Sequence, residues 1–99
     1  MSAVVEQTQY RRGLILHTLE AAYPQPLARR VLERTRSPAY AGEPSTALQR
    51  DVAYLVDRGL VVESTVSIDD LQIPQLRITP DGIDIVQRVR TEPGVRLER

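Results

Sequence analysis

The chain has no cysteine, so it can form neither a disulfide nor a thiolate metal site, and it offers no cysteine nucleophile. His17 is the only histidine, and no cluster of the kind that metal sensors use accompanies it. The five glycines are scattered, which excludes a glycine-rich loop that cradles phosphates. We therefore expect no metal, no cofactor and no enzymatic activity.

Long apolar runs are also missing. The first run, Leu14–Leu16, is too short for a signal peptide, and no stretch approaches the length of a membrane span. These absences predict a cytoplasmic protein with no membrane partner. The 99 residues, of which 41% are hydrophobic and 26% charged, suit one small globular domain. Thirteen basic and thirteen acidic residues give no net charge, a balance that does not favour a nucleic-acid partner.

Three helices are expected in the first part of the chain. The first covers Val4–Tyr23, and Pro24 and Pro26 end it. The second covers Leu27–Arg36 and the third Pro44–Arg58, with a loop between them. Their apolar spacing predicts these buried residues: Ile15, Leu19 and Ala22 in the first helix, Leu27, Val31 and Leu32 in the second, and Leu48, Val52, Leu55 and Val56 in the third.

A hairpin and a fourth helix are expected after Gly59. The strands cover Leu60–Ile68 and Ile73–Thr79 and are joined by a long tip that contains Asp69 and Asp70. Alternation places Val62, Val66 and Ile68 on one side of the first strand and Leu76 and Ile78 on one side of the second. The fourth helix begins with Thr79 as its cap and extends to Arg90. We expect a domain over residues 1–92 and a loose tail over 93–99.

This order of elements predicts a mainly α fold with a β-hairpin, in which a three-helix core carries a two-stranded wing and a C-terminal helix. The segments Leu48–Val61 and Leu76–Gly82 resemble the recognition helix and wing end of winged helix-turn-helix regulators of the ArsR, MarR and PadR types. A narrower resemblance, through Arg11–Leu16 and Pro93–Val95, is to small winged-helix proteins of Mu-like prophages.

The resemblance implies that the third helix enters the major groove of double-stranded DNA. Glutamine can bond adenine edges and arginine can bond guanine edges or phosphates. The candidate DNA-binding residues are Arg29, Arg30, Arg34, Thr46, Gln49, Arg50 and Tyr54, and Arg11, Arg12 and Arg36 are further phosphate candidates. Asp69 and Asp70 at the wing tip argue against DNA, because carboxylates repel phosphates.

A second apolar stripe predicts a homodimer through the terminal helices. Its residues are Tyr10, Leu14 and His17 in the first helix and Ile85 and Val89 in the last. Two functions fit the sequence: a DNA-binding transcriptional regulator, and a protein-interaction module of phage or prophage origin that binds no specific DNA.

Overall fold

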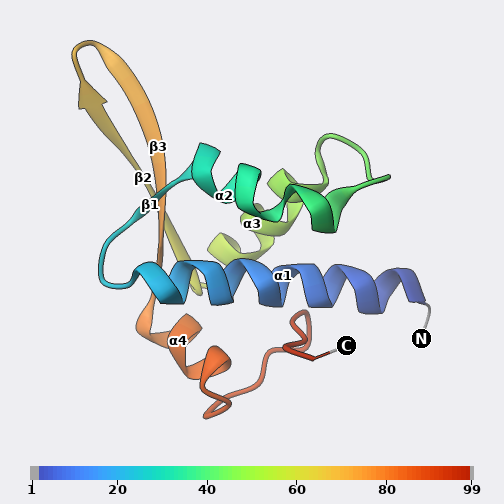
Figure 1. Ribbon diagram of the computed structural model, residues 1–99. Coiled ribbons are helices and arrows are strands. Elements are labelled where there is room, and N and C mark those ends of the chain that lie inside the picture. The colour runs from blue at the N-terminus through green and yellow to red at the C-terminus, as the bar shows by residue number, and fades with distance from the viewer. Residues whose placement is uncertain (1–2, 99) are drawn as a thin grey trace.

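The computed structural model describes residues 3–98 (Figure 1). The elements follow in the order α1 (Ala3–Ala22), β1 (Leu27–Ala28), α2 (Arg29–Arg36), the 3₁₀ helix η1 (Ser37–Tyr40), α3 (Ala47–Asp57), β2 (Val61–Ile68), β3 (Leu71–Ile78) and α4 (Pro80–Val86). The expected mainly α fold with a wing is confirmed, and the wing's strands belong to a three-stranded antiparallel sheet.

The core lies where α1, α2 and α3 meet the base of the sheet. Its fully buried side chains are Ile15, Leu16, Leu19, Leu32, Leu55, Leu60, Val61, Leu76 and Ile78. Ile15 and Leu19 confirm the inward face expected for the first helix. The expected burial of Val31 is wrong, because this residue is 41% exposed. Four other expected core residues are only partly buried: Ala22, Leu27, Leu48 and Val56.

The second helix begins two residues later than expected. Leu27 and Ala28 form β1 and pair with Leu76 and Gln75 of β3, so the sheet has the order β1–β3–β2. Ala28 has extended backbone angles (φ −59°, ψ 136°), which suit a strand rather than a helix. The strand forms because partner groups on β3 are available, a long-range condition that local spacing does not reveal.

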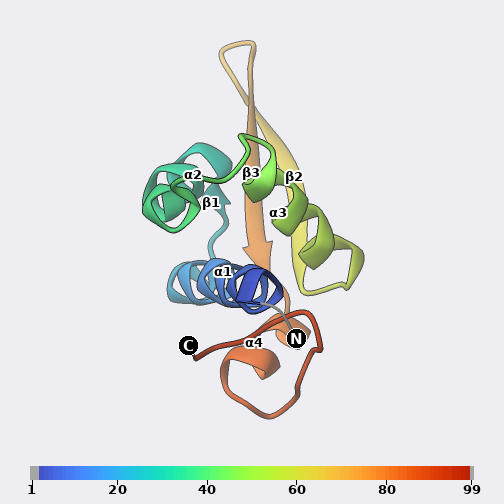
Figure 2. The same ribbon diagram turned by 90° about the vertical axis from the view of Figure 1, so that its right-hand side faces the viewer.

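The hairpin closes with a tight turn instead of the long tip that was expected. Val61 pairs with Ile78 at its base, and Ile68 pairs with Leu71 next to the turn. Asp69 and Asp70 both have positive φ (50° and 68°), as a two-residue turn of the mirror-image type requires. In both views the hairpin projects well beyond the helices (Figures 1 and 2).

The expected alternation of the first strand is confirmed, and the side with Val62, Val66 and Ile68 faces away from the core. Val61 is buried, whereas Val62 is 44% exposed and Ile68 is 51% exposed. The register places Val61 on the same face as Leu76 and Ile78, so the odd positions of β2 point toward the core at its base. Val62, Val66 and Ile68 share the opposite face.

The last helix is capped as expected but ends early. The Thr79 hydroxyl accepts a hydrogen bond from the amide of Gly82 at 3.1 Å. The helix ends at Val86, not Arg90, and Arg88 has φ 63°, which no α-helix continues.

The C-terminal segment is packed rather than loose. The amide of Arg96 donates to the carbonyl of Gln9 on α1 at 3.0 Å, and Val95 contacts the core cluster. Gly13 permits this approach, because a Cβ there would lie 2.1 Å from the carbonyl oxygen of Arg96. Figure 2 shows the segment beside α1.

Candidate nucleic-acid interface

The solvent-facing side of α3 carries most of the expected base-reading residues. Thr46, Gln49 and Arg50 are exposed, with Ala53 and Asp57 on the same side. They lie there because Val52 and Leu55 turn the opposite side of the helix into the core. Three of the candidate residues are therefore accessible to a ligand along one face of this helix.

Two arginines of α2 are equally accessible. Arg30 and Arg34 are exposed and stand four residues apart, so they share one face of the helix. Within residues 3–98, neither guanidinium makes a hydrogen bond or ion pair. Figure 2 shows α2 and α3 on either side of the base of the hairpin.

Arg29 differs from these two arginines. Its guanidinium donates to Glu63 of β2 at 2.5 Å and lies 3.9 Å from Glu33 on its own helix. Two carboxylates already pair with it, so Arg29 is less available to a phosphate than Arg30 and Arg34 are.

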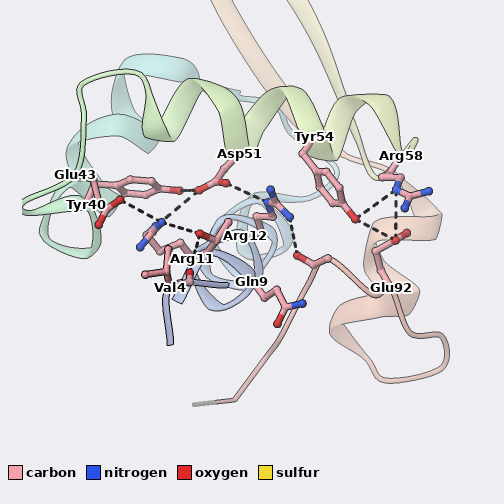
Figure 3. A network of polar contacts seen from close by, with 12 residues as sticks. Val4, Gln9, Arg11, Arg12, Tyr40, Glu43, Asp51, Tyr54, Arg58 and Glu92 are labelled. Atoms are coloured by element: carbon pink, nitrogen blue, oxygen red, sulfur yellow. Dashed lines mark hydrogen bonds and ion pairs between the residues drawn. The ribbon is translucent and has the colours of Figure 1, made fainter. Parts of the chain in front are cut away.

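Tyr54 is also removed from the expected interface. Its ring lies under the guanidinium of Arg12, which is 3.8 Å from the ring centroid. Its hydroxyl donates to Glu92 at 3.3 Å and accepts from Arg58 at 3.3 Å, and this hydrogen bond raises the pKa of Arg58. Tyr54 holds the C-terminal segment against α3, because the segment's Glu92 is buried beside it (Figure 3).

A buried carboxylate, Asp51, organises the inner side of α3. It is 3% exposed and accepts hydrogen bonds from Arg12 at 3.0 Å and from the hydroxyl of Tyr40 at 2.5 Å. Arg11 lies 3.8 Å away and also approaches Glu43 at 3.5 Å (Figure 3). Arg11 and Arg12 were further phosphate candidates, and in the folded chain both side chains pair with this carboxylate instead of standing free.

The cluster ties three segments to α3. Burial beside Asp51 raises the pKa of Tyr40, so its hydroxyl stays protonated and remains a donor. Tyr40 anchors η1, while Arg12 joins α1 to Asp51 and to the carbonyl of Gly94 at 3.2 Å. The position of the exposed face of α3 thus depends on Asp51. The sequence did carry a signal, since Asp51 stands three residues after Leu48 and four before Leu55 on the inward side.

One of the residues expected to form a dimer is buried in the core of the single chain. Ile85 is 3% exposed and belongs to the core, so its expected role is wrong. Val89 follows the end of α4 and is 72% exposed. His17 is exposed, and Tyr10 and Leu14 line an open hollow of about 720 Å³ between α1, η1 and the C-terminal segment.

Among residues 3–98, no three His, Asp or Glu side chains are grouped so as to hold a metal ion. No helix in that range is both long and apolar enough to cross a membrane.

The arrangement of a helical core, a helix beside the base of a hairpin and a projecting wing defines a winged helix-turn-helix fold. A solved structure from Thermoplasma acidophilum, of a protein proposed to be a transcriptional regulator, is similar with a TM-score of 0.60. The match has 18% sequence identity and covers 78% of this chain and 77% of that chain.

No family model matches the sequence, and no curated protein does. At this identity the structural likeness shows the fold alone. Nothing supports the narrower resemblance to proteins of Mu-like prophages.

Proposed function

We propose that the protein is a winged-helix transcriptional regulator that binds double-stranded DNA through α2 and α3. The observation that carries the proposal is the distribution of arginines. Within residues 3–98, seven arginines form ion pairs: Arg11, Arg12, Arg29, Arg58, Arg88, Arg90 and Arg96. Within the same residues, Arg30, Arg34 and Arg50 instead keep exposed, unpaired guanidiniums on α2 and α3, where an anionic backbone can reach them, and Arg77 on β3 is also exposed and unpaired.

The roles of the exposed residues differ. Arg30 and Arg34 hold phosphates, which fixes the position of the domain on the duplex. Gln49 and Arg50 contact base edges in the major groove, and Thr46 lies at the start of the same helix. The likeness to a proposed regulator supports this assignment at the level of the fold. A regulator of this kind would act in the cytoplasm, the location expected from the sequence.

Fluorescence anisotropy on a labelled random duplex tests the proposal. Wild-type binding should weaken as salt rises from about 50 to about 200 mM, because bound phosphates release counterions. Arg30→Ala and Arg34→Ala should each lower the slope of log K against log salt by about 1. Arg50→Ala should weaken binding to a selected sequence by about 1–3 kcal/mol and relax its specificity.

Arg88→Ala is the matched control. Arg88 is also exposed, but it lies beyond α4 and pairs with Glu98 at 2.8 Å. Its removal should leave the salt slope unchanged. If the slope of log K against log salt falls equally in the Arg88 and Arg30 variants, DNA is attracted to the charge of the whole protein. The interface would then not lie on α2 and α3.

The acidic wing tip favours a second candidate, a protein-interaction module without DNA binding. Asp69 and Asp70 are both exposed and stand where a wing that follows phosphates needs cations. If wild-type protein binds no duplex at any ionic strength, the protein-interaction module is favoured over the DNA-binding regulator.

A further inference from the structure

The two faces of the projecting hairpin differ sharply in polarity. On one face the cross-strand pairs are Val62 with Arg77, Ser64 with Gln75, Val66 with Ile73, and Ile68 with Leu71. On the opposite face, beyond the core, Thr65 pairs with Pro74 and Ser67 with Gln72. We call the first of these the apolar wing face; its apolar members are Val62, Val66, Ile68, Leu71 and Ile73.

No other element of the described chain covers the apolar wing face. Leu71 is 64% exposed, Ile68 51% and Val62 44%. The third strand, β1, reaches only as far as Gln75, so the outer hairpin is a two-stranded ribbon. A two-stranded ribbon is marginally stable in water, and five neighbouring apolar side chains on one face gain from being covered.

The charges on the hairpin restrict what can cover this face. The turn at its outer end carries Asp69 and Asp70, and the base of the same face carries Arg77. The Arg77 side chain is exposed and makes no hydrogen bond or ion pair within residues 3–98. The face is thus acidic at one end, apolar in the middle and basic at the other end. Two copies of this face are therefore complementary in charge when they pack in antiparallel orientation.

We propose that the apolar wing face binds the same face of a second copy of this chain, with the two hairpins antiparallel. A two-fold axis near Ile73 places Ile73 against its equivalent and Leu71 over Gln75 of the other copy. Each acidic turn then lies near the other copy's Arg77. A parallel arrangement would bring four carboxylates together and is disfavoured by charge.

The size of the face sets the strength of the association. Eight residues of strand extend about 26 Å, and two strands lie about 5 Å apart, so the contact is smaller than a standard protein interface. The dimer should therefore be weak and concentration-dependent, with a Kd on the order of tens of micromolar.

Sedimentation velocity on the full chain from about 5 to about 500 µM, a range that brackets weak association, tests the proposal. Wild-type mass should rise with concentration toward that of a dimer. Leu71→Lys and Arg77→Glu should each weaken association by about tenfold or more, because one removes apolar contact and the other places like charges together. Val4→Lys is the matched control, since Val4 is 69% exposed but lies near the start of α1, far from the hairpin (Figure 1).

Cross-linking tests the direction of the hairpins, and the absence of native cysteine makes it clean. In a mixture of the two proteins, a disulfide between Leu71→Cys and Gln75→Cys should form faster than either variant forms a disulfide with itself. A wild-type monomer over the whole range would overturn the proposal. A dimer whose affinity Leu71→Lys leaves unchanged would also overturn it. The same holds if Leu71→Cys forms a disulfide with itself faster than it does with Gln75→Cys.

Discussion

Replacing Asp51 with alanine tests whether the buried ion cluster positions α3. The substitution leaves the guanidinium of Arg12 without its 3.0 Å acceptor and the hydroxyl of Tyr40 without its 2.5 Å acceptor. Removing one partner of a buried ion pair costs about 3–5 kcal/mol. Arg12 keeps the carbonyl of Gly94 and the ring of Tyr54, and Arg11 keeps Glu43, so we expect the lower value, about 3 kcal/mol.

A loss of about 3 kcal/mol corresponds to a fall in Tm of roughly 12–24 °C for a domain of this size. Urea denaturation followed by circular dichroism measures the free energy of unfolding directly. Asp57→Ala is the control on the same helix, because Asp57 is exposed and should change stability by less than about 0.5 kcal/mol. A loss below about 1 kcal/mol for Asp51→Ala would refute the reasoning, since a buried charge cannot lose its partner so cheaply.

Two further substitutions test the core and the cluster. Leu55→Ala should cost about 2–5 kcal/mol in denaturant titrations, because Leu55 is fully buried, and a loss below about 0.5 kcal/mol would mean that it is not. Tyr40→Phe should change the alkaline limb of the stability curve. The raised pKa of Tyr40 favours folding fully below its unfolded pKa of about 10, and this contribution declines above that pH as the unfolded chain ionises. Wild type should therefore lose stability more steeply than Tyr40→Phe above about pH 10, and parallel curves would contradict this.

The helices and the hairpin were predictable because their signals are local. Leu48, Val52 and Leu55 repeat at helical spacing, and Thr79 followed by proline marks a helix start. The orientation of β2 was not predictable in this way. Leu60, Val61 and Val62 are all apolar, so alternation alone cannot decide which valine faces inward, and a shift of one residue exchanges the two faces. The pairing of Val61 with Ile78 decides it, and that pairing joins distant parts of the chain.

Contacts between residues still further apart in the sequence decide which arginines stay unpaired and accessible. A net charge of zero weighs against DNA only if acidic and basic groups are mixed over the whole surface. In the folded chain Asp51 forms ion pairs with arginines of α1. Glu63 of β2 pairs with Arg29, and Glu92 pairs with Arg58. Those pairings neutralise arginines elsewhere and leave five arginines without a carboxylate partner within residues 3–98: Arg30, Arg34, Arg36, Arg50 and Arg77. Because the partners in a pair such as Arg12 and Asp51 are 39 positions apart, composition cannot show which cations remain available to a ligand.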